Sequence, residues 1–185
     1  MKQRVWLAAS VLAIAAILSA PARCRAQTRC TWLNAATAAG VLGGAVQMTV
    51  AVTPDSEKDA DQDAYSAPEQ RFGRPDAVCE FTRNVDSKVY SLRIDVKSMT
   101  DPAKQFPAFL TLCKGTTVAL KGIGNEAVQC VIKSDAGMSS EQVLGRVRER
   151  AFVLTIVRAA APASNGDGLR NDTRNMAEQV AGSLF

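Results

Sequence analysis

Apolar and polar residues alternate along several short segments of the chain, which predicts β-strands with one buried face. Residues 45–53, 77–83, 126–133 and 142–148 are strand candidates, and residues 116–120 are a weaker candidate for a short strand. The alternation is clearest over residues 88–98, where one face is formed by Tyr90, Leu92, Ile94 and Val96. Residues 150–157 are apolar on both sides, so we expect a central strand that is covered on both faces.

Three segments with helical spacing accompany the strands. The first, residues 30–44, ends at a glycine pair, and the last, residues 169–184, repeats apolar positions every three to four residues. The middle segment, residues 100–113, begins with Thr100-Asp101-Pro102, a typical helix start. We expect Pro107 to kink or split that middle helix.

The spacing of these segments predicts the fold class. Residues 54–76 are acidic, contain three prolines and hold few large apolar residues, which predicts a mobile surface loop. A tight turn at residues 84–87 joins two of the strands. Clustered strands flanked by helices predict an α+β domain, with a mainly antiparallel sheet of about six strands packed with N-terminal, middle and C-terminal helices.

The N-terminus has the three parts of a secretory signal. Lys2 and Arg4 precede an uncharged apolar run at residues 5–20, and small residues follow. Cleavage after Ala22 or after Ala26 fits the small-residue rule, whereas Arg23 argues against lipid attachment at Cys24. We therefore expect residues 1–26 to be a signal peptide and residues 27–185 a single exported domain, periplasmic or secreted, without a membrane span in its mature form.

Charge and residue usage exclude several function classes. The whole chain carries a formal charge of +4, but the predicted signal contains Lys2, Arg4, Arg23 and Arg25, so 18 basic and 18 acidic residues remain. A neutral exported domain is not expected to bind nucleic acid. The chain has no histidine, which excludes Ser-His and Cys-His nucleophile pairs and imidazole metal sites.

Cleavage after Ala26 leaves an even number of cysteines, which favours two disulfides in an oxidising compartment. Their spacing lacks the close pairs of a zinc site, so no metal or cofactor is expected. Three connectivities are possible. We favour the sequential pairing, in which the four residues pair as Cys30–Cys79 and Cys113–Cys130.

Three further patterns suggest sites. Acidic residues 59–63 resemble the first half of a calcium loop but lack the second half, and the glycines at 122 and 124 predict a turn rather than a phosphate loop. Glu126 and Asp135 are conceivable paired carboxylates, although nothing in the sequence brings them together. The candidate interaction face consists of Arg146, Arg148 and Arg150, which would share one side of a regular strand; the alternative is a wet face with Glu141 and Glu149 nearby.

Several short motifs occur together across the predicted mature chain. They are Cys30 before a helix ending Leu42-Gly43-Gly44, Cys79-x-Phe81 after the loop, Gly122-x-Gly124-Asn125-Glu126-Ala127, and the closing Ala181-Gly182-Ser183-Leu184-Phe185. The pattern resembles a group of exported bacterial proteins of unknown function and the small sensor ectodomains of bacterial receptor Ser/Thr kinases. The resemblance implies an α+β sandwich with disulfides and a ligand-binding cleft, and it brings no catalytic residue.

From these observations we expect a non-catalytic exported binding or interaction domain rather than an enzyme. Its partner would be an envelope component or a small apolar ligand. Two alternatives stay open. One is an enzyme that acts on an envelope polymer through carboxylate or lysine chemistry. The other is an envelope accessory protein that docks a protein partner through the arginine face or the acidic loop.

Overall fold

The computed structural model describes residues 29–52, 75–113, 116–132, 137–160 and 166–185. The predicted signal peptide, most of the predicted acidic loop and the calcium-like residues 59–63 lie outside the described residues. The described part has the element order α-β-β-β-α-β-β-β-β-α. That order confirms the α+β class.

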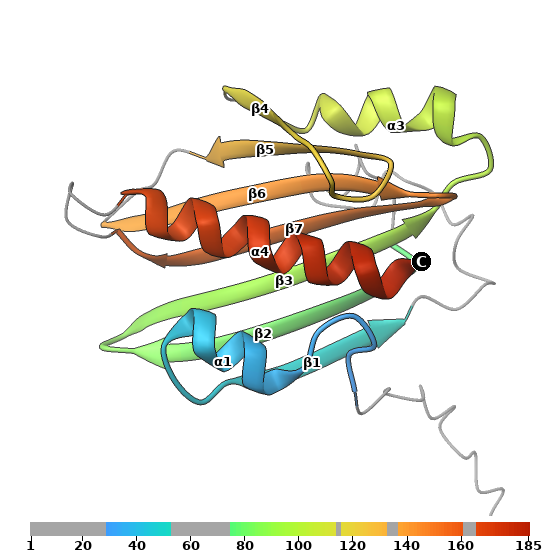
Figure 1. The fold of residues 1–185 in the computed structure, drawn as a ribbon. Helices are drawn as coiled ribbons and strands as arrows, with labels where there is room; N and C mark the ends of the chain where they lie inside the picture. Colours follow the sequence, from blue (N-terminus) through green and yellow to red (C-terminus); the bar gives the residue numbers. More distant parts are fainter. Residues whose placement is uncertain (1–28, 53–74, 114–115, 133–136, 161–165) are drawn as a thin grey trace, which may run out of the picture.

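Within the described residues, seven strands form one antiparallel sheet in the order β1-β2-β3-β7-β6-β5-β4 (Figure 1). Their bounds are β1 (Gln47–Val52), β2 (Ala77–Val85), β3 (Lys88–Ser98), β4 (Thr117–Leu120), β5 (Glu126–Ile132), β6 (Met138–Val147) and β7 (Arg150–Ala159). The sequence indicated about six. The weakest signal belongs to β4, an edge strand of four residues with three of them exposed, because exposed positions carry little hydrophobic alternation.

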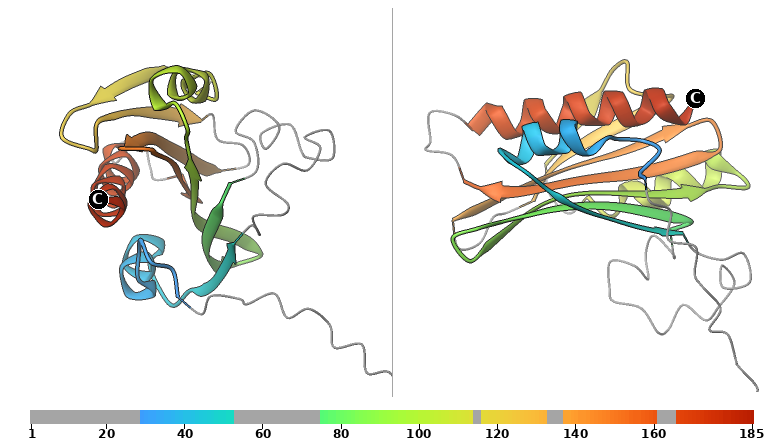
Figure 2. Two further views of the ribbon diagram at one scale, coloured as in Figure 1. Left: turned by 90° about the vertical axis from the view of Figure 1, so that its right-hand side faces the viewer. Right: turned by 90° about the horizontal axis from the view of Figure 1, so that it is seen from below.

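Helices cover both faces of the sheet. They are α1 (Ala35–Leu42), α3 (Pro102–Leu110) and α4 (Gly166–Leu184). Figure 2 shows α1 and α4 side by side on one face, and α3 lies against the other. The larger core lies between the sheet and the α1–α4 layer, and a smaller one lies beneath α3.

β7 is the central strand, with β3 on one side and β6 on the other. Phe152, Leu154 and Ile156 are fully buried toward α1 and α4, whereas Ala151 and Val153 belong to the core beneath α3. The prediction of a strand covered on both faces is confirmed. A strand in this place must be apolar on both sides because neither face reaches water.

The helix boundaries differ from the sequence prediction in instructive ways. α1 begins at Ala35, not near Cys30, because the Asn34 side chain caps it by accepting the Thr37 amide at 2.8 Å. It ends as predicted at Gly43, whose φ of 78° suits glycine. α3 continues through Pro107, so the proline does not split it.

Candidate functional site

Both favoured cysteine pairs are present. Cys30–Cys79 ties the segment before α1 to β2, and Cys113–Cys130 ties the end of α3 to β5, each with a Cα–Cα separation of 5.7 Å. Cys79 and Cys130 are almost fully buried in the two cores. Each bond therefore joins a segment outside the sheet to a strand within it, which is a structural role.

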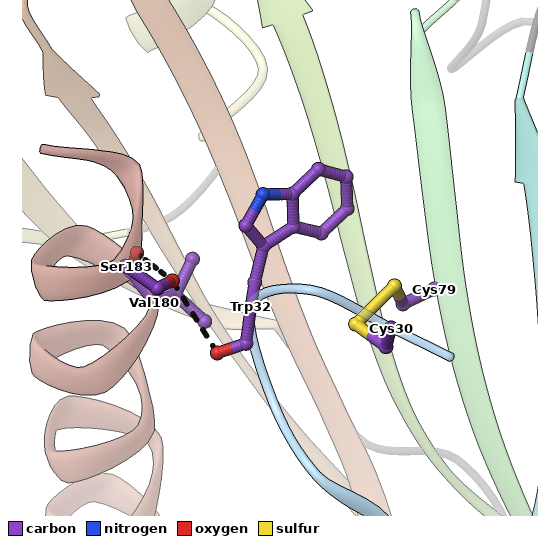
Figure 3. Close-up of a disulfide and its surroundings, with 5 residues drawn as sticks. All are labelled: Cys30, Trp32, Cys79, Val180 and Ser183. Atoms are coloured by element: carbon purple, nitrogen blue, oxygen red, sulfur yellow. Dashed lines mark hydrogen bonds between the residues drawn. A yellow bond between two sulfur atoms is a disulfide. The ribbon is translucent and has the colours of Figure 1, made fainter.

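Trp32 joins the first disulfide to the C-terminal helix. Figure 3 shows it between the Cys30–Cys79 bond and α4. The Trp32 carbonyl oxygen lies 3.4 Å from Ser183 Oγ, which also lies 2.8 Å from the carbonyl oxygen of Val180. The partly buried Trp32 side chain packs against the larger core. This corner thus fastens the first described residues of the chain to the last helix.

The three arginines do not form the expected stripe along one strand. Arg146 lies on β6 opposite Ala151, whereas Arg150 is the first residue of β7 and lies opposite Val147. Arg148 occupies the two-residue turn between these strands, with a φ of 52°. The expectation of one shared strand face is wrong because the chain reverses at residues 148–149.

Arg146 is largely covered by its neighbours and is ion-paired within the domain. Its guanidinium donates to Glu126 Oε1 at 2.6 and 3.0 Å, and it lies 5.9 Å from the ring centroid of Phe106. Its side chain is only 20% exposed. Arg146 therefore links β6, β5 and α3, and Glu126, a candidate catalytic carboxylate, is its ion-pair partner.

Arg148 and Arg150 are exposed, in contrast to Arg146. Neither makes an ion pair within the described residues. The Arg148 guanidinium lies 5.6 Å from the ring centroid of Phe185 at the end of the chain. We call residues 148–150 the arginine turn.

Backbone contacts fix the arginine turn in place. The Arg148 amide donates to Asn125 Oδ1 at 2.6 Å, and the Asn125 amide donates to the carbonyl oxygen of Arg146 at 2.8 Å. On the other side, the Met99 amide donates to the carbonyl oxygen of Glu149 at 2.6 Å. These bonds hold Arg148 in a left-handed conformation that non-glycine residues rarely adopt.

The loop that carries Asn125 is the predicted glycine turn. Gly122 and Gly124 both have positive φ, and a β-carbon at Gly124 would overlap the Arg146 carbonyl. Glycine is therefore required at 124 so that this loop can pack against β6. The turn prediction is confirmed, and β5 follows it directly.

A buried polar group that the sequence analysis missed lies beneath α4. Glu141 on β6 is 6% exposed and Gln129 on β5 is 3% exposed. The Gln129 amide Nε2 lies 3.3 Å from Glu141 Oε2 and 3.0 Å from the Arg170 carbonyl oxygen. Burial raises the pKa of Glu141, and the charge of Arg170 and the Gln129 hydrogen bond oppose that shift.

The sequence assigned Glu141 to a wet face, and that assignment is wrong. Glu141 has the same strand parity as Val143 and Val147, which are fully buried toward α1 and α4. Parity was therefore the signal that could have placed Glu141 inside. It was obscured because polar residues precede Glu141 and Gly145 interrupts the apolar face.

The remaining chemical candidates can be placed only in part. Asp135, the proposed partner of Glu126, lies outside the described residues. Among those that the structure describes, Glu141 is the single buried carboxylate, and no cluster of cysteine and acidic side chains could hold a metal ion. None of the helices in that part combines the length and hydropathy needed to cross a bilayer.

Comparisons with known proteins do not assign a family. No family model matches the chain, and no curated protein matches it. The crystal structure of Ara h 8.0201 aligns with 12% sequence identity and a TM-score of 0.20, over 60% of this chain and 68% of that chain. That similarity is too low to indicate a shared fold.

Proposed function

We propose that this protein is an exported, non-catalytic interaction domain that docks an acidic envelope partner through the arginine turn. The observation that carries the proposal is the contrast among three arginines within five residues. Arg146 forms an ion pair with Glu126, whereas Arg148 and Arg150 are exposed and make no ion pair within the described part. Exposed guanidinium groups are well suited to carboxylate or phosphate partners.

The rigidity of the turn supports this role. Asn125 and Met99 hold its backbone from two sides, so little backbone freedom remains to be lost on binding. Arg148 stays in a strained backbone conformation although glycine would relieve the strain. Strained backbone conformations cluster at ligand-binding and other functional sites.

Export is supported by the two cysteine pairs. Both tie distant segments together, with sequence separations of 49 and 17 residues. Disulfides persist in oxidising compartments and are rare in the cytosol. Together with the predicted signal peptide, they favour a location outside the cytoplasmic membrane.

The test is retention of the purified oxidised domain on an isolated envelope fraction at low and high salt. At low salt, we expect the retained amount of the double variant Arg148→Glu and Arg150→Glu to be at least about tenfold lower than that of the wild type. The reason is that two attractive contacts become repulsive. The same fraction treated with excess salt should release the wild-type domain.

A matched charge reversal controls for overall charge. Lys88 starts β3 at the opposite end of the sheet from the arginine turn, because Ser91 pairs with Val157 whereas Ser98 pairs with Arg150. The variant Lys88→Glu with Arg174→Glu changes the net charge equally and should be retained like the wild type. Equal retention of the arginine-turn variant and the wild type would refute the proposal.

A further inference from the structure

α4 is attached to the sheet by two kinds of contact. Its C-terminal half is held by buried apolar side chains, which are Met176, Ala177, Val180, Ala181 and Leu184. Its N-terminal half is held by one buried apolar side chain, Leu169, and by polar contacts. Gln129 donates to the Arg170 carbonyl oxygen, and Arg158 of β7 donates to Asp172 Oδ2 at 2.7 Å. The N-terminal half therefore has fewer buried apolar anchors than the C-terminal half and relies in addition on polar contacts to the sheet.

Gln129 connects this half of α4 to Glu141. The Nε2 group of Gln129 has two hydrogens, and the two contacts to the Arg170 carbonyl and the Glu141 carboxylate account for both. The carboxylate therefore orients the amide that holds the helix. Because both side chains are less than a tenth exposed, water cannot readily replace either contact.

The charged groups around Glu141 leave it poorly compensated. From α4 it faces Arg170, whose guanidinium lies 3.7 Å from Asp167 and is 48% exposed. On β7, Arg158 is already paired with Asp172. The neighbouring strand β5 presents the uncharged Gln129. An ionised Glu141 would thus be a buried charge whose facing cation is shared with Asp167 and lies near water.

We propose that Glu141 is a proton-binding site that controls how firmly the N-terminal half of α4 is held on the sheet. When Glu141 is protonated, the neutral carboxyl group fits its buried position and the helix stays closed. When it ionises, opening of the first turns of α4 lets water reach the charge. The C-terminal half of the helix stays attached through its apolar contacts.

The direction of the effect follows from proton linkage. Burial raises the pKa of Glu141 in the closed state above its ordinary value of 4.5. The closed state therefore binds the proton more tightly than the open state. Its extra stability is complete below pH 4.5 and is lost as the pH rises through the closed-state pKa. Because one proton is involved, the opening equilibrium constant rises by at most about tenfold per pH unit.

The test is amide hydrogen exchange along α4 as a function of pH, with intrinsic exchange rates divided out. In the wild type, opening of residues 170–175 should increase from pH 4.5 upward, whereas residues 178–184 should not change. Glu141→Gln keeps the size and the hydrogen bond to Gln129 and should abolish the pH dependence. Glu178→Gln, an exposed site on the same helix, should behave like the wild type.

Two results would overturn the proposal. One is a Glu141→Gln variant with the wild-type pH dependence, and the other is a wild-type domain whose residues 170–175 open equally at every pH. If the variant does not fold, a carbon-13 titration of the wild-type Glu141 carboxyl decides the question. A carboxyl pKa at or below 4.5 would then exclude the proposed site.

Discussion

Replacement of Gly145 by alanine tests the packing of the larger core. Gly145 on β6 lies directly opposite Phe152 on β7, and a β-carbon at 145 would overlap the ring of Phe152. That ring is fully buried, so it cannot swing into solvent. Overpacking of this kind costs about 1–3 kcal/mol, whereas alanine is favoured over glycine in a strand by about 0.5–1 kcal/mol. The midpoints of these two ranges differ by about 1 kcal/mol, and we expect Gly145→Ala to lower the free energy of unfolding by about that amount.

Urea unfolding of the oxidised domain measures this change, with fluorescence of the partly buried Trp32 as the probe. Gly40→Ala is the control, because nothing lies within 4 Å of its added β-carbon. In the interior of α1 that alanine should stabilise the domain by up to about 1 kcal/mol. In a Phe152→Leu background, which removes the ring, Gly145→Ala should cost less.

Two outcomes would contradict a steric conflict between residue 145 and Phe152. If Gly145→Ala is as stable as the wild type, or if its cost is the same with and without the Phe152 ring, the two residues are not coupled. The close approach of Phe152 to the β6 backbone would then not be the reason for glycine at 145.

Two further predictions concern a turn and the disulfides. Asp86 and Ser87 both have positive φ in the turn between β2 and β3, so Ser87→Gly should raise the free energy of unfolding by up to about 1 kcal/mol, and an unchanged urea midpoint would contradict this. Loss of a disulfide by paired Cys→Ser replacement should cost about 4 kcal/mol for Cys30–Cys79 and about 3 kcal/mol for Cys113–Cys130, because the closed loops differ in length. Calorimetry of each double variant measures the two losses of stability. A larger loss for the shorter loop, Cys113–Cys130, would contradict this prediction.

Local sequence pattern was sufficient for most of the elements and for the class of fold. Alternation over residues 88–98 identified β3, and an apolar run on both faces identified β7 as central. The glycines at 43 and 124 marked a helix end and a turn, as the structure confirms. These signals work because the side-chain direction in a strand and the φ tolerance of glycine are properties of the local backbone.

Which segments lie side by side was decided by the tertiary structure. The pairing of β3 with β7 joins residues about 60 positions apart, and nothing local to either strand encodes that choice. The same holds for the candidate site. The sequence does not distinguish Arg146, Arg148 and Arg150. In the structure, Glu126 on β5 forms an ion pair with Arg146, and the chain reverses before Arg150.

Burial of single polar residues also depended on distant parts of the chain. Glu141 would be exposed in an isolated strand. It is buried here because α4 covers its face of β6 and Gln129 of β5 reaches it. Sequence periodicity reports which side of a strand a residue occupies. It cannot report what covers that side, since the covering element is set by the balance of packing over the whole domain.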